Sequence, residues 1–195
     1  MARKRVQLRR EEIIDATVRQ IANRGIAATR VKDVAKDLHV STGLIFYHFE
    51  TKEALVAAAF PRAMARDLES LDEIVQHSSS ARARISDLLE LYGPAGDAAG
   101  WRLWIDGWAA ALQDGDMATA VREIDARWRN ALSSLITEGN QSGEFVCIDP
   151  EASAGRITAL LDGLAVRVVA RRDELSSGLR QSWVVTVLDF ELAAA

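Results

Sequence analysis

The spacing of apolar residues along the chain predicts helices from one end to the other. Between residues 9 and 23, apolar side chains recur three and four positions apart, which indicates a helix with one buried face. Those side chains belong to Ile13, Ile14, Val18, Ile21 and Ala22. Gly25, just after this pattern, supplies the left-handed backbone that ends many helices.

Three more helices follow, the first two of them short, and each is opened by a residue suited to cap a helix. We expect Thr29 to cap a second helix that ends near Leu38. Ser41 is expected to cap a third helix that runs to about Phe49, and Thr51 is expected to cap a fourth. Short helices joined by tight turns predict a helix-turn-helix unit, in which residues 41–48 form the recognition helix.

The remaining residues predict a larger helical body. The fourth helix is expected to extend towards Gln76 with a kink at Pro61, because proline removes a hydrogen bond and clashes with the preceding turn. Asp149 and Pro150 are suited to the N-cap and first position of another helix. Breaks are expected at 78–80, 93–96 and 114–116, and further helices at about 83–92, 101–112, 117–138, 151–171 and 177–192.

The composition is that of a folded protein of one or two domains. The chain has 195 residues, of which 49% are hydrophobic. It lacks an apolar run of roughly 18 residues, so we expect no membrane span, and the charged residues between Gln7 and Asp15 argue against a signal peptide. The single cysteine, Cys147, excludes an internal disulfide and indicates a cytoplasmic protein.

Charge is distributed unevenly along the chain, which has a formal net charge of −4. Residues 1–52 contain eleven Lys and Arg residues against six Asp and Glu residues, including all four lysines, whereas the remainder is net acidic. A basic end on an acidic body predicts one surface for a polyanion, although a chance imbalance would give the same counts.

The predicted recognition helix carries groups that suit a DNA surface. Ser41 and Thr42 place hydroxyl and N–H groups at a helix N-terminus, which attracts phosphate. Gly43 costs roughly 1 kcal/mol relative to alanine inside a helix, so its presence indicates a packing or contact reason. Tyr47 and His48 can donate to phosphate oxygens, although a core position for Tyr47 and a structural role for His48 remain alternatives.

The run GIAATRVKDVAKDLHVSTGLIFYHFETKEAL, from Gly25 to Leu55, resembles the TetR family of regulators. The matching positions are Gly25-Ile26, Thr29, Val31, Val34-Ala35, Val40-Ser41, Gly43, Phe46-Tyr47-His48-Phe49 and Lys52-Glu53. The resemblance implies DNA contacts, mostly with phosphates, with Thr42, Gly43 and Leu44 best placed for base edges. The implied contact residues are Thr29, Arg30, Ser41, Thr42, Gly43, Leu44, Tyr47, His48 and Lys52.

Two positions depart from the pattern of that family. Arg30 stands where many members have Ser or Thr, and a longer phosphate contact can replace the hydroxyl one. His39 stands where many have glycine in the turn, and histidine tolerates a left-handed backbone better than most residues. Both departures make the operator sequence harder to predict.

Residues 101–172 resemble, less closely, the C-terminal domain of the choline-responsive, BetI-type members of the same family. The matching positions are Trp101 to Trp108, Trp128, Gly139, Gly143-Glu144-Phe145 and Leu161-Asp162-Gly163-Leu164. The two resemblances imply an all-α protein. Residues 1–52 would form the three-helix, helix-turn-helix DNA-binding domain, and residues 53–195 a larger helical domain for ligand binding and dimerisation.

Tryptophans at 101, 104 and 108 would form one stripe on a helix. Such residues are mostly core, but an aromatic wall beside an acid also holds ammonium groups through cation–π contacts. Asp106 and Asp162 lie in apolar surroundings, so each needs an internal arginine or a ligand cation as partner. The pocket hypothesis places a small amphipathic or cationic effector among Phe60, Tyr92, Trp104, Trp108, Trp128 and Asp162.

The last two predicted helices carry more apolar residues than one flank of a small body needs. Packed against their symmetry mates they would form a four-helix bundle, whereas the alternative is that they close the core of the monomer. The residues expected at this dimer surface are Leu161, Leu164, Val168, Trp183, Val184, Val187 and Leu188. Two-fold symmetry would set the recognition helices about one DNA turn, ~34 Å, apart on a near-palindromic operator.

These observations predict a regulator that binds double-stranded DNA as a homodimer and is released by a small molecule, with repression as the usual outcome in the family it resembles. The alternative is a helical dimeric sensor or interaction module without specific DNA binding. An enzyme is disfavoured, because the HExxH, GxxxxGK[ST], GxSxG and CxxC motifs are absent. The three histidines lack metal-ligand spacing, so we expect neither a metal nor a cofactor.

Overall fold

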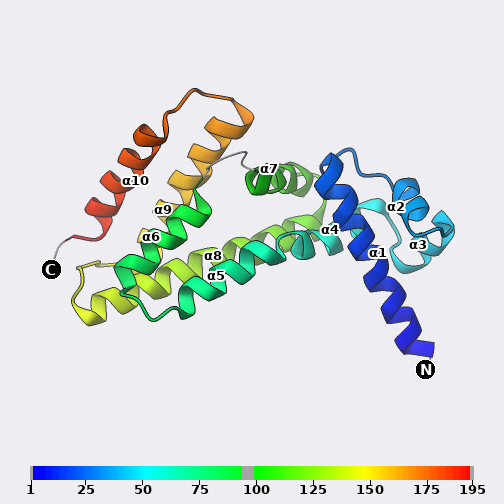
Figure 1. The fold of residues 1–195 in the computed structure, drawn as a ribbon, viewed down its shortest axis with the longest axis horizontal. Coiled ribbons are helices and arrows are strands. Elements are labelled where there is room, and N and C mark those ends of the chain that lie inside the picture. Colours follow the sequence, from blue (N-terminus) through cyan, green and yellow to red (C-terminus); the bar gives the residue numbers. More distant parts are fainter. Residues whose placement is uncertain (1, 94–98, 194–195) are drawn as a thin grey trace. The chain divides into compact units, whose positions relative to one another are not determined.

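The computed structural model describes residues 2–93 and 99–193, and helices make up most of this part of the chain (Figure 1). The all-α prediction is confirmed, since the described residues form no strand beyond one isolated bridge between Val146 and Ala193. The helices are α1 (Ala2–Arg24), α2 (Val31–Asp37), α3 (Thr42–His48), α4 (Lys52–Ala63), α5 (Ala65–Gln76), α6 (Ala81–Tyr92), α7 (Ala99–Ala111), α8 (Gly115–Ser142), α9 (Pro150–Ala165) and α10 (Ser177–Glu191).

The chain divides into two compact units that do not follow the order of the sequence. Unit 1 comprises residues 1–66 and 102–124, and unit 2 comprises residues 67–101 and 125–195. Helices α7 and α8 therefore contribute residues to both units. The division predicted after residue 52 concerns function and not compactness, because it was expected to separate a DNA-binding domain from a ligand-binding domain. It stays a prediction.

In unit 1, α1 packs along α4, and the short helices α2 and α3 follow from its end (Figure 1). Of the apolar face expected on α1, Ile13, Ile14 and Ile21 are at most 5% exposed, whereas Val18 is half-buried and Ala22 is exposed. On α4 the buried residues include Leu55 and Phe60. Burial of side chains of this size stabilises each by about 1.5–3 kcal/mol relative to exposure, so this face holds the N-terminal helices of unit 1 together.

Unit 2 has its own apolar core, to which α6, α8 and α9 contribute. Its most deeply buried side chains include Leu88, Leu132, Leu135, Ile157 and Leu161. The N-terminus of α6 is closed twice, because the Ser80 hydroxyl accepts the N–H of Ala83 and the Glu144 carboxylate accepts the N–H groups of Ala81 and Arg82. These backbone bonds hold the pKa of Glu144 below its ordinary value.

Several boundaries differ from those predicted. The expected kink at Pro61 is instead an end of the helix, since α4 stops at Ala63, Met64 is its C-cap, and α5 begins at Ala65. Helix α8 begins at Gly115, where the Asp114 carboxylate accepts the N–H of Met117. The break predicted at 93–96 is seen only as the end of α6 at Tyr92, because residues 94–96 lie outside the described part.

Helix α9 passes directly into a π-helical turn over Val166–Ala170, after which Arg172 has a positive φ of 56°. The expected N-cap of α9 is confirmed, since the Asp149 carboxylate accepts the N–H of Ala152 and Pro150 occupies the first turn. The turn at the other end lacks a glycine or a proline, which explains why sequence spacing predicted one uninterrupted helix to residue 171.

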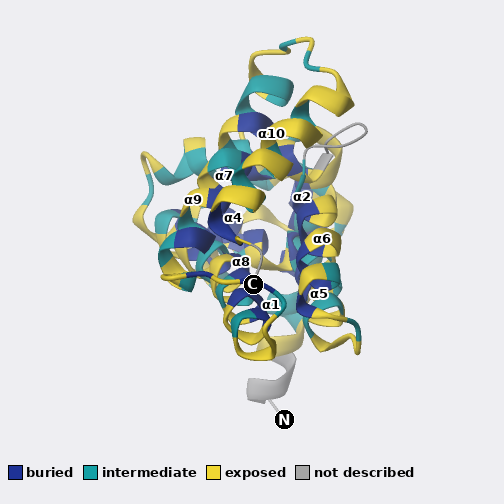
Figure 2. Cartoon of the chain, turned by 90° about the vertical axis from the view of Figure 1, so that its left-hand side faces the viewer, coloured by how far each residue is buried: buried dark blue, intermediate teal, exposed yellow. Residues whose placement is uncertain are grey.

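Helix α10 buries a single residue, Glu191, and the rest of the helix is intermediate or exposed (Figure 2). The Glu191 carboxylate accepts hydrogen bonds from Arg156 Nε at 2.5 Å and from the Ser153 hydroxyl at 2.6 Å, both on α9. A cation–π contact from Arg167 to the ring of Trp183, at 5.8 Å, lies nearer the start of α10. These contacts tie α10 to α9 and to the π-helical turn that follows it.

Gly107 on α7 provides a test of packing in unit 1. A Cβ at this position would lie 2.7 Å from two ring carbons of Phe60, a side chain that is fully buried. Overpacking costs about 1–3 kcal/mol, and the gain in helix propensity offsets only about 1 kcal/mol. We therefore expect Gly107→Ala to lower the free energy of unfolding by up to about 2 kcal/mol in urea denaturation.

The matched control is Gly155→Ala in α9, where nothing lies within 4 Å of the new Cβ. There the propensity term acts alone, and the free energy of unfolding should rise by up to about 1 kcal/mol. Equal effects of the two substitutions would show that Phe60 does not fill the space beside Gly107.

Candidate functional site

Helix α3 presents a polar surface on an apolar support. Ser41, Thr42, Gly43 and Tyr47 are exposed, with Tyr47 at 74%, which excludes the core position considered for its ring. Beneath them Ile45 is fully buried. Leu44, His48 and Lys52 are half-buried, so each reaches the surface at one end. The arrangement suits contact with a flat, charged partner over one face of α3.

Local capping fixes where α3 begins and ends. The Ser41 hydroxyl accepts the N–H of Leu44 at 3.2 Å, and the Thr51 hydroxyl accepts the N–H of Ala54 at 3.0 Å, as predicted for both. His39 has a φ of 55°, so the turn before α3 adopts the left-handed backbone expected at this position. The edge of the Tyr47 ring meets the His48 ring at 5.3 Å, which orients both side chains.

Thr29 differs from its prediction. The N-cap of α2 is Arg30, and its side chain makes no capping bond. Thr29 is 1% exposed and its hydroxyl donates to the carbonyl of Gly25 at 2.8 Å. The prediction of a Thr29 cap was wrong because Thr29 closes the turn that Gly25 opens with a φ of 79°. Its side chain orients this turn, while the neighbouring Arg30 is exposed.

Three residues of the predicted effector pocket pack together in unit 1. The rings of Phe60 and Trp104 meet edge to face, with their centroids 6.1 Å apart. The ring centroids of Trp104 and Trp108 are 6.0 Å apart. Phe60 and Trp104 are at most 4% exposed, whereas Trp108 is intermediate. The tryptophans of α7 thus have different neighbours, since Trp101 belongs to a second cluster in unit 2.

The other three residues of the predicted pocket meet in unit 2, around the ring of Tyr92. This ring packs edge to face against two tryptophans, with its centroid 4.9 Å from that of Trp101 and 4.8 Å from that of Trp128. The Tyr92 hydroxyl donates to the Asp162 carboxylate at 2.8 Å. The Trp128 ring is 3% exposed, and its N–H has no hydrogen-bond partner among the described residues. We call these four residues the aromatic–acid cluster.

Burial sets the protonation of the aromatic–acid cluster. It raises the pKa of Asp162 to about 6, although the hydrogen bond from Tyr92 opposes this shift. Burial and the neighbouring Asp162 carboxylate also raise the pKa of Tyr92 far above its ordinary value, so the phenol stays a donor. The internal arginine considered for Asp162 is otherwise engaged, because Arg167 pairs with Asp173 at 3.0 Å.

The residues predicted for the dimer surface fall into two groups. Leu161 and Leu164 on α9 are at most 2% exposed, so within one chain they belong to the core of unit 2. Trp183 on α10 is 36% exposed, and Val168, Val184, Val187 and Leu188 are intermediate. Helix α10 also exposes Leu179 at 42% and Phe190 at 84%. Apolar surface therefore remains uncovered on α10.

Other kinds of site find no support among the described residues. No group of His, Cys, Asp and Glu side chains there is arranged to hold a metal ion. No described helix has the length and apolar character needed to cross a membrane.

Comparison with known families assigns both halves of the chain. Residues 13–59 match the model described as bacterial regulatory proteins, tetR family. Residues 81–192, more than half of the chain, match the model of the BetI-type transcriptional repressor, C-terminal. The chain belongs to the TetR family. As a member it is a ligand-responsive, DNA-binding transcriptional regulator and not an enzyme.

Individual TetR-family relatives agree with this assignment. The chain is 27% identical to the HTH-type transcriptional regulator BetI of Stenotrophomonas maltophilia, over 96% of this chain and 95% of that one. It is 29% identical to the fatty acid metabolism regulator protein of Bacillus subtilis, over 69% of each chain. A transcriptional regulator from Saccharomonospora viridis, solved in complex with choline, shares the fold with a TM-score of 0.79 at 24% identity, covering 95% of this chain and 98% of that one.

Sequence reasoning missed the role of Asp106 in this TetR-family regulator. Its carboxylate accepts the backbone N–H of Ile26 at 3.0 Å, in the turn between α1 and α2, and needs no arginine. A Cβ on Gly25 would lie 2.7 Å from the same carboxylate oxygen. The one signal in the sequence was an acid in an apolar stretch, which does not identify a backbone partner 80 residues away.

The raised pKa of Asp162 predicts a pH-dependent gain in stability on its replacement by asparagine. The folded pKa of about 6 lies above the unfolded value of about 3.9, so the folded chain holds this proton more tightly. The stability that this proton confers is complete below pH ~4 and is lost as pH rises through ~6. Asp162→Asn should therefore stabilise the protein at pH 8 more than at pH 4.5, measured by urea denaturation.

Tyr92→Phe supplies the control for this effect. It removes the hydrogen bond that lowers the pKa of Asp162, so the pH at which stability falls should move upward. A stability difference between the wild type and Asp162→Asn that stays constant from pH 4.5 to 8 would contradict the raised pKa.

Proposed function

We propose that this regulator binds a near-palindromic operator as a homodimer and that a small cationic effector releases it. The exposed polar face of α3, held on buried Ile45 and capped by Ser41, is the observation that carries the DNA-binding part. Direct contacts are proposed for Arg30, Ser41, Thr42, Gly43, Leu44, Tyr47, His48 and Lys52, and an orienting role for buried Thr29.

The exposed apolar side of α10 supports self-association. Soluble proteins seldom leave large apolar residues exposed over a contiguous area, and α10 exposes Leu179, Trp183 and Phe190. A second copy of the chain is the proposed cover, in a bundle of α9 and α10 with their symmetry mates. The proposed surface comprises Leu161, Leu164, Val168, Trp183, Val184, Val187 and Leu188, with Leu161 and Leu164 supporting it from below.

The aromatic–acid cluster supports a cation as effector. Aromatic faces and a carboxylate together bind ammonium groups, with a cation–π contribution of roughly 0.5–2 kcal/mol for each ring. The buried N–H of Trp128, which has no hydrogen-bond partner among the described residues, supports a ligand group beside it. A structural neighbour binds choline, a quaternary ammonium compound, which makes choline the first effector to test.

Release follows from a shift of populations. If the effector binds a conformation in which the spacing of the two recognition helices does not match the operator, effector binding lowers the fraction of protein on DNA. A tenfold loss of DNA affinity needs only ~1.4 kcal/mol of differential binding. Phe60, Trp104 and Trp108 are proposed to take part in this change from unit 1, where Phe60 joins α4 to α7.

The DNA-binding proposal predicts specific, salt-dependent binding. Genomic fragments selected by the purified protein should share a near-palindrome with half-sites about one turn, ~34 Å, apart. Lys52→Gln should reduce the slope of log affinity against log salt by about one, whereas Tyr47→Phe should weaken binding about tenfold at an unchanged slope. A filter-binding titration across a salt series measures both.

Tyr47→Phe keeps the exposed ring and removes only the hydroxyl, so it separates contact from folding. A single half-site in the selected fragments would contradict the dimer. Equal, weak binding to all fragments would favour the alternative, a helical sensor or interaction module without specific DNA binding.

The effector proposal predicts that choline binds more tightly as pH rises from about 5 to about 7.5. The cation requires the ionised form of Asp162, whose pKa is about 6, so affinity should level off above that range. Asp162→Asn should remove this pH dependence, and Trp128→Phe should weaken binding at every pH. Isothermal titration calorimetry of the full chain provides the measurement.

Trp104→Phe and Trp108→Phe test the wider pocket. If neither changes choline affinity or release from DNA, the single pocket of six residues is wrong, although the aromatic–acid cluster can still bind. Choline binding without any dependence on Asp162 would overturn the cluster itself.

A further inference from the structure

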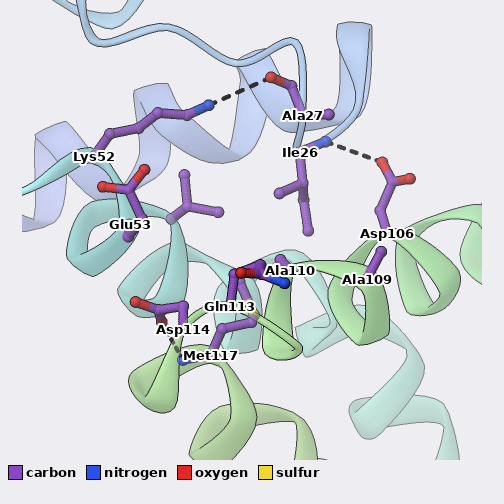
Figure 3. Close-up of a pocket in the computed structure, with 11 residues that line it drawn as sticks. Ile26, Ala27, Lys52, Glu53, Asp106, Ala109, Ala110, Gln113, Asp114 and Met117 are labelled. Carbon is purple, nitrogen blue, oxygen red and sulfur yellow. Dashed lines mark hydrogen bonds between the residues drawn. The ribbon is translucent and has the colours of Figure 1, made fainter.

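Unit 1 contains a pocket of about 320 Å³ whose lining shares no residue with the aromatic–acid cluster (Figure 3). One wall comes from the N-terminal part of unit 1, with Ile26 and Ala27 in the turn after α1 and Lys52, Glu53 and Val56 at the start of α4. The other wall comes from the end of α7 and the start of α8, with Asp106, Ala109, Ala110, Gln113, Asp114 and Met117. Its volume is at the lower end of the range of about 300–1,000 Å³ for small-molecule sites.

The base of this pocket is apolar and its edge is polar. Ile26, Val56 and Met117 are at most 6% exposed and form the apolar part together with the two alanines of α7. Glu53 and Gln113 are exposed, and their side chains make no hydrogen bond within the described residues. Apolar lining with a few polar groups that lack partners is the usual character of a ligand site.

The acids at the edge determine the charge of a suitable ligand. Three carboxylates, those of Glu53, Asp106 and Asp114, line the pocket against one ammonium, that of Lys52. Two of these acids already accept backbone bonds, Asp106 from Ile26 at 3.0 Å and Asp114 from Met117 at 2.7 Å. Glu53 is therefore the carboxylate left for a ligand, and the excess of negative charge favours a cation.

We propose that this pocket is a second effector site, which takes a small amphipathic cation with its apolar part against Ile26, Val56 and Met117 and its charged end beside Glu53. The site is independent of the aromatic–acid cluster and involves none of its residues. It touches the turn before α2 and the start of α4, the two segments between which α2 and α3 lie in the chain.

The position of the pocket couples its occupancy to DNA reading. The Asp106 carboxylate and the Lys52 ammonium, which donates to the carbonyl of Ala27 at 3.3 Å, already hold the turn after α1 from two sides (Figure 3). A ligand between these walls adds contacts to whichever arrangement of the head it fits best. By linkage, ligand and operator then change each other's affinity by the same factor.

Carbon-13 labelling of the methionine methyl groups provides a local test on the full chain. Met117 lines the pocket, whereas Met64 is fully buried in unit 1 and outside the lining, so it serves as internal reference. Titration with n-hexylammonium should shift the Met117 methyl resonance to saturation. n-Hexanoate, which has the same chain length and opposite charge, should not. Absence of a saturable shift, or equal binding of hexanoate, would overturn the proposal.

Variants place the binding event. Glu53→Gln should weaken n-hexylammonium binding about two- to fivefold, as expected for a partly exposed ion pair. Ala109→Phe, at an exposed position of the lining, should abolish the Met117 shift by filling the space. Leu112→Phe, also exposed on the segment after α7 but outside the lining, is the control. Unchanged binding in Ala109→Phe would place the ligand elsewhere.

The coupling is tested with the operator fragment selected above. Saturating n-hexylammonium should change operator affinity, and saturating operator should change n-hexylammonium affinity by the same factor. A bound ligand with no effect on operator affinity would overturn the coupling. Trp128→Phe should leave the Met117 response intact, so failure of the choline proposal and failure of this one are distinguishable.

Discussion

The helix-turn-helix part of the chain depends on the burial of one face of α1 against α4. Helices α2 and α3 are seven residues each, too short to be stable alone, so they need a surface to pack against. Ile13, Ile14 and Ile21 provide it from α1, and α4 extends the same core to Phe60. Phe60 then reaches α7, where only a glycine leaves room for its ring. A single apolar core in unit 1 thus connects the three helices at the N-terminus with α4 and α7.

Features set by local chemistry could be predicted from the sequence. Ser41, Thr51 and Asp149 cap helices as expected because a short polar side chain needs only the N–H groups two or three residues ahead. The left-handed turn at His39 was expected from the glycine that many members of the TetR family have at this position, and histidine tolerates that backbone. The prediction for Thr29 was wrong because its hydroxyl can bond either to a following N–H group or to the carbonyl of Gly25. In the folded chain Thr29 is buried and bonds to the carbonyl.

Features set by distant segments could not be predicted. The tryptophans of α7 share a helical stripe, yet Trp104 packs with Phe60 and Trp101 with Tyr92, because different segments of the chain approach successive turns. The partners of Asp106 and Asp162 lie 80 and 70 residues away, and neither is an arginine. Composition showed that these acids needed partners, but spacing along one helix carries no information about which backbone N–H or phenol arrives from elsewhere.

Glu191 gives α10 a property that its apolar residues alone would not. A helix usually attaches to its own chain by burying its apolar side chains, which are then no longer exposed to a partner. Here the single buried side chain of α10 is a carboxylate, fastened to Arg156 and Ser153. Glu191 fastens the C-terminal end of α10 to α9 through ionic and hydroxyl groups, while Leu179, Trp183 and Phe190 of the same helix stay exposed. The position of this exposed apolar surface therefore depends on a carboxylate that lies outside it.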